Sequence, residues 1–234
     1  MSEARDTILA GIRRSLGRGR LGAGDEAQLR ARLAAHRRNL VPLRATALDH
    51  RGRIDLFVAM AEEVQATIAR VDSLAEVPEA VVSYLAAENQ PAELVLAPDP
   101  SLEEIPWDAR PLLQLRRGRA EADDAVSLTP CFAAVAETGT LMLISGSATP
   151  TTLNFLPDTH IVVVRAAQIV ATYEDGWDRL RAGEARLPRA VNFITGPSRT
   201  GDIEQRIVLG AHGPRRLHII LVDDREQADN VQDE

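Results

Sequence analysis

The chain has 234 residues, which allows one large domain or one domain with an appendage. Hydrophobic residues make up 45% and aromatic residues only 3%, so aliphatic side chains must form most of the core. Its formal net charge is −7. Cys131 is its single cysteine, which excludes an intrachain disulfide and an iron–sulfur cluster held by thiolates of this chain alone. It contains no lysine, which excludes a lysine Schiff base, a lysine nucleophile and a P-loop lysine.

The sequence has no run of about 18 apolar residues, so we expect no transmembrane helix. The opening residues, MSEARDTILAGIRRSLG, carry charges at Glu3, Arg5 and Asp6 and lack a long apolar segment. We therefore expect no secretory signal and a cytoplasmic location.

The charge is distributed unevenly along the chain. Residues 1–44 hold ten arginines and four acidic residues, a net charge of +6, which leaves −13 on the remainder. A basic segment can bind nucleic acid, but this one has no aromatic side chain between its arginines. The pattern favours a solvated helix face, or a docking surface for an acidic partner, over nucleic-acid binding.

The same segment has apolar residues at helical spacing. They recur every three or four positions from Ile8 to Leu16 and predict one amphipathic helix, and a second helix is predicted from Asp25 to Leu40. We therefore expect residues 1–44 to form an arm of amphipathic helices, whose apolar stripe packs on the main domain or on another subunit.

The main domain is predicted over residues 45–222. Apolar residues from Ile54 to Ile68 predict a third helix, and apolar runs of strand character then alternate with helical patterns. Strands are expected at 93–97, 132–136, 140–144, 161–164, 191–195 and 217–222, and helices at 77–88 and 173–181. This alternation predicts an α/β fold with a mainly parallel sheet covered by helices. Residues 223–234 are acidic and are expected to form a disordered tail.

The segment from Gly17 to Gly22 matches the spacing G-x-G-x-x-G of dinucleotide-binding loops. Such a loop follows a strand and opens a helix, whereas here a helix is predicted before it. The segment is therefore interpreted as a linker, and we expect no nicotinamide, flavin or other cofactor.

A turn between two apolar runs, Glu137-Thr138-Gly139-Thr140, contains a candidate catalytic acid. A glycine turn at the carboxyl edge of a parallel sheet would aim Glu137 into the ligand crevice as a nucleophile, a base or a hydrogen-bond acceptor. Thr138, Gly139 and Thr140 would then line the ligand. The alternative is a β-hairpin turn, in which threonine and glycine are common, and the spacing alone favours the hairpin.

The segment from Thr195 to Glu204 is the richest in candidate binding residues. It leaves an apolar strand and offers flexible glycines, two hydroxyl groups after Gly196, one arginine and two acids. These groups suit a carboxylate or phosphate ligand. The alternative is a turn followed by a helix N-cap, and the sequence favours neither. The candidate ligand-binding residues are Gly196, Ser198, Arg199, Thr200, Asp202 and Glu204.

Three histidines and the cysteine complete the candidates. His212, in the glycine-rich corner 210–214, is a candidate proton shuttle, with an exposed turn histidine as the alternative. His160 is predicted at a strand edge with a backbone hydrogen bond, His218 half-buried within a strand, and Cys131 as a buried structural thiol. No metal site is predicted, because the histidines lack the spacing of H-x-x-x-H or H-E-x-x-H motifs.

Three segments together resemble one family. AETGTLMLISG (136–146) with LPDTHIVVV (156–164) is similar to the central signature of LUD-domain proteins, and ITGPSRTGDIEQRIVLGAHGPRRLHIILVD (194–223) is similar to their C-terminal signature. DTILAGIRRSLG (6–17) resembles the opening of the LutC/YkgG branch, the lactate utilisation C group. The resemblance covers most of the chain and is more specific than any short motif above.

The resemblance implies a fold similar to the NagB/RpiA/CoA-transferase group. It also implies a role in oxidising L-lactate to pyruvate, together with two iron–sulfur partner proteins. Lactate oxidation needs a redox carrier, and this chain has neither a cysteine cluster nor a nucleotide fingerprint. We therefore expect a binding, assembly or regulatory subunit, with electrons passing through the partners.

Two alternatives stay open at the level of sequence. One is a free-standing enzyme on a small carboxylate, acyl-CoA or phosphorylated metabolite, with Glu137 as nucleophile or base and with Ser198 and Arg199 holding the anion. The other is a metabolite sensor that performs no chemistry.

Overall fold

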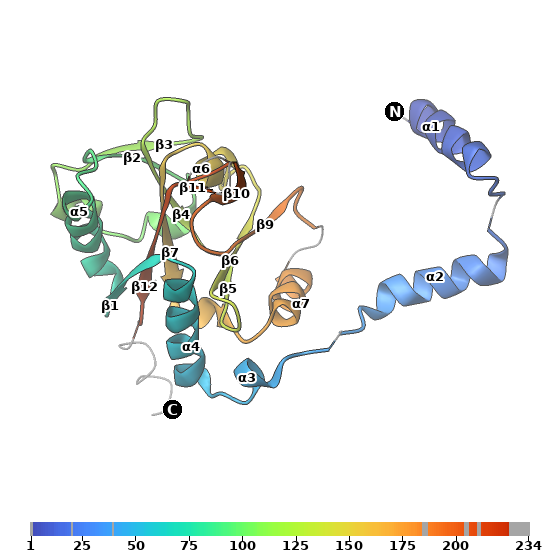
Figure 1. Cartoon of the computed structure of the whole chain (residues 1–234), viewed down its shortest axis with the longest axis horizontal. Coiled ribbons are helices and arrows are strands. Elements are labelled where there is room, and N and C mark those ends of the chain that lie inside the picture. The colour runs from blue at the N-terminus through green and yellow to red at the C-terminus, as the bar shows by residue number, and fades with distance from the viewer. Residues whose placement is uncertain are drawn as a thin grey trace. The chain divides into compact units, whose positions relative to one another are not determined.

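The structure is a computed structural model that describes residues 2–19, 21–38, 40–183, 187–203, 206–209 and 212–224 (Figure 1). The chain divides into two compact units, Met1–Leu40 and Val41–Glu234. No helix among the described residues has the length and apolar character needed to span a membrane. Most of the expected acidic tail, from residue 225 onward, lies outside the described residues.

The first unit contains two helices, α1 (Ser2–Ser15) and α2 (Ala23–Ala35). The prediction that α2 begins at Asp25 is wrong, because the extended backbone of Gly22 occupies the N-cap and the acidic residues fall in the first turn. Negative charge is favourable in that first turn, where the helix dipole is positive. α2 ends earlier than predicted, where His36 adopts a left-handed φ of +40°.

The second unit opens with two helices, α3 (Leu43–Thr46) and α4 (His50–Glu63). The Asp49 carboxylate accepts a hydrogen bond of 2.7 Å from the backbone amide of Gly52. Since the first amides of a helix have no partner within it, this N-cap determines where α4 starts.

The end of α4 differs from the prediction. Gln65 adopts a φ of +68°, which stops the helix, and β1 (Thr67–Val71) follows. Ile68 lies in this strand and pairs with Ile219, so the predicted helix from Ile54 to Ile68 is wrong at its end. The helical spacing of apolar residues therefore extends past the end of α4 into the strand.

The centre of the second unit is a six-stranded sheet in the order β1-β12-β7-β4-β2-β3, and every neighbouring pair is parallel (Figure 1). The prediction of a mainly parallel sheet is therefore confirmed. After β1 the strands are β2 (Glu93–Leu96), β3 (Gln114–Arg117), β4 (Val126–Pro130), β7 (Thr159–Arg165) and β12 (Arg216–Val222).

Apolar residues cover both faces of this sheet. Side chains of successive strand residues point to opposite faces, so Ile219 and Ile220 of β12 enter different cores. Ile220 packs in a core with Val81 of α5 (Val77–Ala87), and Ile219 packs in a core with Phe57 of α4. The continuous apolar character of β12 is thus explained by burial on both sides.

A second, four-stranded sheet has the order β8-β5-β6-β9. Three predicted strands lie in it rather than in the parallel sheet, a separation that the sequence pattern did not indicate. Its strands are β5 (Ala133–Val135), β6 (Thr140–Ile144), β8 (Ile169–Val170) and β9 (Val191–Ile194). One face of this sheet belongs to the core that also contains α4. Helix α7 (Tyr173–Gly183) packs on the other face, where its Leu180 lies in a small core with Met142 of β6.

Short elements complete the second unit. They are the helical turns η1 (Leu74–Glu76), η2 (Pro100–Leu102), η3 (Trp107–Ala109), α6 (Thr152–Phe155) and η4 (Ala166–Gln168), and the hairpin strands β10 (Arg199–Ile203) and β11 (Arg206–Leu209).

Two glycines let the turns of the second sheet approach the backbone of α4. Gly139 has a φ of +63°, and a Cβ placed there would lie 2.3 Å from the amide nitrogen of Ala61. Gly196 has a φ of +70°, and its Cβ would lie 2.2 Å from the carbonyl oxygen of Val64. Since no side chain fits at either position, both glycines are required for packing against this helix.

We expect Gly139→Ala and Gly196→Ala each to lower the free energy of unfolding by at least about 2 kcal/mol, because the new methyl group meets rigid backbone at positive φ. Urea denaturation of the purified variants measures this loss. Gly183→Ala is the control, since a Cβ there meets nothing within 4 Å. Equal stability of all three variants would contradict the account.

Two histidines are buried on the parallel sheet. His218 stacks on the ring of Tyr84 with centroids 3.8 Å apart, and its Nδ1 lies 2.8 Å from the hydroxyl of Thr67. Burial lowers the pKa of His218 to about 4 and the pKa of His160 to about 3. Both imidazoles are therefore neutral in the folded protein near neutral pH.

The depressed pKa values make stability depend on pH. At pH values between the folded pKa and the ordinary pKa of about 6.5, the unfolded chain takes up protons that the folded chain does not. Stability should therefore be complete above about pH 6.5 and should fall as the pH is lowered, by up to about 1.4 kcal/mol per pH unit for each histidine. His218→Phe should show a smaller slope in urea titrations, whereas a slope equal to that of the unsubstituted chain would refute the assignment.

Candidate functional site

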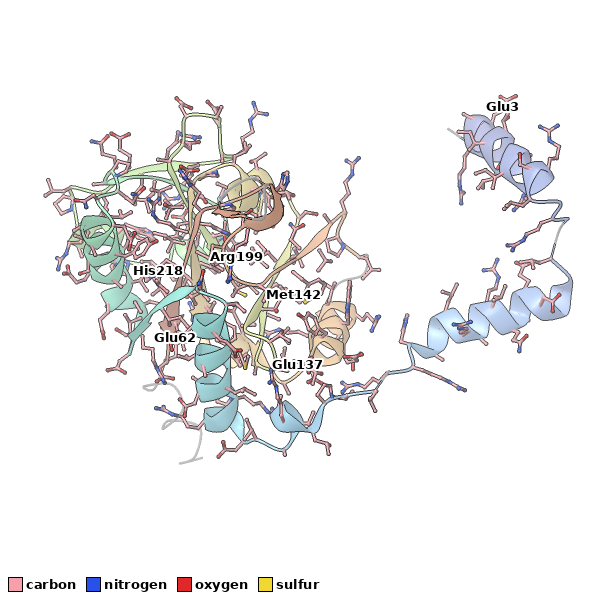
Figure 2. All side chains as sticks on the ribbon, in the orientation of Figure 1. Glu3, Glu62, Glu137, Met142, Arg199 and His218 are labelled. Carbon is pink, nitrogen blue, oxygen red and sulfur yellow. The ribbon has the colours of Figure 1, made fainter. Side chains whose placement is uncertain are left out.

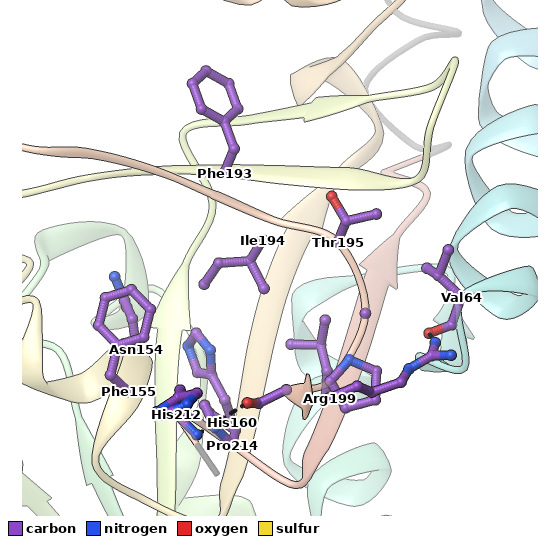
Figure 3. A pocket seen from close by; sticks show the side chains of 15 residues that line it. Val64, Asn154, Phe155, His160, Phe193, Ile194, Thr195, Arg199, His212 and Pro214 are labelled. Atoms are coloured by element: carbon purple, nitrogen blue, oxygen red, sulfur yellow. Dashed lines mark hydrogen bonds between the residues drawn. The ribbon is translucent and has the colours of Figure 1, made fainter. Parts of the chain in front are cut away.

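A cavity of about 540 Å³ lies between the second sheet and the amino-terminal ends of β7 and β12 (Figure 3). Its wall comes from five places in the chain: the end of α4, helix α6, the start of β7, the exit of β9, and the segment 212–217. Pockets of this size are typical of sites for small molecules. The cavity therefore gathers segments that are far apart in sequence into one candidate binding site.

Four of the predicted site residues line this cavity: Gly196, Ser198, Arg199 and His212. The backbone amide of Ser198 donates to the carbonyl of Pro214 at 2.8 Å, and its hydroxyl accepts a hydrogen bond of 3.3 Å from the backbone amide of His212. These contacts join the segment after β9 to the corner before β12. The two glycine-rich segments therefore form one wall, although about a dozen residues separate them.

Arg199 lies at the exposed edge of the cavity. Its guanidinium donates a hydrogen bond to the carbonyl of Val64, at the C-terminal end of α4 (Figure 3). A cation is favourable there because the last carbonyls of a helix lack partners within it. Arg199 thus stabilises α4 as well as placing positive charge beside the cavity.

The segment after Arg199 does not form the turn and helix N-cap that the sequence left open as the alternative to an anion site. It enters the β10–β11 hairpin instead, with Thr200 paired to Val208. Asp202 lies in the same strand and therefore does not cap a helix. Glu204 lies outside the described residues.

His160 is a buried polar residue of the cavity. Its ring has no exposed surface, and its Nε2 lies 2.8 Å from the hydroxyl of Thr129. This side-chain partner replaces the backbone hydrogen bond expected from the sequence. Its Nδ1 has no hydrogen-bond partner among the described residues. A buried nitrogen without a partner is rare in proteins and marks a place where a ligand or water can bind.

The turn that contains Glu137 is the hairpin turn between β5 and β6, as its spacing favoured. Glu137 is only 5% exposed, and its carboxylate accepts a hydrogen bond of 3.3 Å from the backbone amide of Tyr173. Its own carbonyl accepts from Arg44. Glu137 is not among the residues that line the cavity, and Figure 2 shows it apart from Arg199.

A chain of hydroxyl groups links the Glu137 turn to the cavity. The hydroxyl of Thr140 lies 2.7 Å from those of Thr138 and Thr195, and 2.9 Å from that of Tyr173. Of these four residues, only Thr195 lines the cavity. Thr138 and Thr140 therefore hold the hairpin turn against β9. Thr195 opens the candidate binding segment but was not itself among the candidate residues, and no motif singles out Tyr173 or the cavity residue Asn154.

A second cavity of about 480 Å³ lies at the carboxyl ends of β2 and β4. It shares Asn154 with the first cavity, and Thr129, the partner of His160, also lines it. Cys131 lies on its wall but is only 4% exposed. The Cys131 thiol donates to the carbonyl of Ala133 at 3.0 Å, and burial raises its pKa to about 12. The thiol is therefore protonated at neutral pH, as a structural cysteine would be.

We expect Cys131 to resist alkylation by iodoacetamide at pH 8 in the folded chain, because the reactive thiolate is scarce and inaccessible. The same thiol should react within minutes in denaturant. Mass spectrometry of the alkylated fraction measures both rates. Equal rates with and without denaturant would show that the thiol is exposed.

In the described part of the chain, no three histidine, cysteine or acidic side chains stand together as metal ligands would. The chemistry available at the first cavity is therefore hydrogen bonding by His160, Asn154 and Ser198, together with the positive charge of Arg199.

Comparison with known proteins places these features in a family context. Residues 54–222 match the family model described as the LUD domain. The chain is 35% identical over 122 residues to "Lactate utilization protein C" of Shouchella clausii, a match covering 51% of this chain and 52% of that protein. It is 36% identical over 154 residues to the protein of the same name from Deinococcus radiodurans, covering 64% and 70% respectively.

A solved structure has a similar fold. A crystal structure of a DUF162 family protein from Deinococcus radiodurans superposes with a TM-score of 0.55 and 27% sequence identity, covering 75% of this chain and 99% of that one. The sequence matches are less complete than the structural one, since the chain spans about half the length of the Shouchella relative.

Proposed function

The chain belongs to the LUD-domain family, and from this premise we propose that it serves lactate utilisation as a binding, assembly or regulatory subunit beside iron–sulfur partner proteins. The names of its relatives from Shouchella clausii and Deinococcus radiodurans support the pathway. The observation that carries the proposal is the first cavity, which residues of two family-like segments, 156–164 and 194–223, combine to form. Such convergence favours a binding role.

The single thiol of the chain supports the proposal that partner proteins, and not this chain, carry the electrons. Moving two electrons from lactate requires a carrier, and a sole cysteine that is buried and protonated cannot anchor a thiolate cluster. We infer that iron–sulfur partners carry the electrons. Cytoplasmic location is part of the same proposal.

The cavity is proposed to hold an organic acid of the pathway or a regulatory anion. Arg199 at its edge supplies positive charge, His212 supplies an imidazole, and Ser198 supplies a hydroxyl. Thr200 and Asp202 stay candidates for the same site through their place in β10, and Glu204, outside the described residues, stays a candidate from the sequence alone.

The geometry gives less support to the alternative of an enzyme with Glu137 as nucleophile or base. Its carboxylate is buried and already accepts a hydrogen bond from Tyr173. Since Glu137 does not line the cavity, Ser198 and Arg199 would hold an anion at a place that Glu137 does not border.

The test is anaerobic purification of the tagged full chain from a bacterium that expresses it with its genomic neighbours. We expect iron–sulfur proteins to co-purify and the complex to reduce an acceptor dye with L-lactate, while the isolated chain does not. Cys131→Ala is the control and should leave the dye reduction of the complex unchanged, because the thiol takes no part. Lactate-dependent dye reduction by the isolated, iron-free chain would overturn the proposal.

A further inference from the structure

The first cavity changes from buried and neutral at one end to exposed and charged at the other. His160 and Asn154 have exposed fractions of 0% and 5%, whereas Arg199 and His212 are exposed. Phe155 and Ile194 contribute apolar surface to the same cavity. A ligand that fills it would meet all three kinds of surface.

The buried end has unsatisfied hydrogen-bonding capacity. Nδ1 of His160 has no partner among the described residues, and Asn154 lines the same cavity. A buried polar atom left unpaired costs about 1–3 kcal/mol, which a ligand group can recover. If the hydroxyl of Thr129 donates to Nε2, Nδ1 carries the ring proton and can donate to that group. If the hydroxyl instead accepts from Nε2, Nδ1 can accept from that group.

The group that binds at this end should be uncharged. A carboxylate placed against a neutral imidazole and an amide would be a buried charge without a cation, which is costly. A guanidinium has five N–H donors, and among the described residues one of those of Arg199 is directed at Val64. Arg199 also lies at the exposed end, where water solvates an anion. The anionic part of a ligand therefore belongs beside Arg199.

The volume argues for a ligand larger than a three-carbon acid. A water molecule takes about 30 Å³ in the liquid, so a molecule of about six non-hydrogen atoms, such as lactate, takes at most about 180 Å³. The cavity holds about 540 Å³. Lactate alone would leave most of the cavity filled with water, including one of the cavity's two polar ends.

We propose that this cavity binds an amphipathic organic anion: an uncharged amide or carbonyl group hydrogen-bonded to His160 and Asn154, an aliphatic body against Phe155 and Ile194, and an acidic group beside Arg199. The inference rests on the proposed function only in treating the cavity as a binding site, and it does not depend on the electron-carrying partners.

The probes are 6-acetamidohexanoate, which has an anion, an aliphatic chain and an amide, and nonanoate, which replaces the amide by methylene groups. Calorimetric titration of the full chain gives the ratio of their dissociation constants. We expect His160→Phe and Asn154→Leu each to change this ratio about tenfold in favour of nonanoate. His218→Phe is the matched control, a buried histidine outside the cavity, and should leave the ratio unchanged.

A readout without substitution accompanies the titration. The ring ¹⁵N resonances of His160 should shift when 6-acetamidohexanoate binds and should shift much less with L-lactate. Failure of both fatty-acid-like probes to bind, an unchanged ratio in the His160 and Asn154 variants that fold, or L-lactate alone shifting the His160 resonances would each overturn the inference. Co-purification with iron–sulfur proteins is scored separately, so either proposal can fail without the other.

Discussion

The close approach of two glycine turns to helix α4 is the contact on which the site depends. Gly139 meets the backbone at Ala61, and Gly196 meets it at Val64. Neither turn could come so near with a side chain, so the same helix determines the position of the β5–β6 hairpin and of the exit from β9. The guanidinium of Arg199 reinforces the second contact by donating to the carbonyl of Val64. Residues that look like parts of an anion-binding loop therefore first hold the exit of β9 against α4.

Helix α4 also determines where the cavity opens. Once β9 is held against α4, the segment from Thr195 to Arg199 passes over the start of β7 and faces the buried ring of His160. The hydrogen bond between the hydroxyls of Thr140 and Thr195 stabilises the pairing of β6 with β9 at this point. Two sheets and one helix therefore enclose a space whose buried end is neutral and whose edge carries an arginine. On the proposal made above, this gradient would select ligands by shape and polarity rather than by charge alone.

The sequence predicted the fold class and the parallel sheet, and it singled out the segment after β9, which lines the first cavity, because long apolar runs and glycine-rich corners are local signals. It could not show that the strand at 140–144 belongs to a second sheet, since strand pairing depends on partners far along the chain. Ile68 continued a helical spacing into a strand, and only the left-handed Gln65 separates the two. For the site, Arg199 and Ser198 stood out by residue type, whereas Asn154 did not, because its role comes from tertiary placement. Glu137 stood out in the sequence as an acid near a glycine. In the structure its carboxylate is buried and accepts a hydrogen bond from the backbone amide of Tyr173.

The most direct test of this account is native-state hydrogen exchange in increasing urea, followed at the amides of α4 residues 60–64 and of β6 and β9. The account predicts that these amides exchange through one cooperative opening with a common free energy, because the glycine contacts join the helix and the second sheet into one unit. If β9 opened at markedly lower free energy while α4 stayed protected, the helix would not be holding the cavity wall, and the explanation of the site would be contradicted.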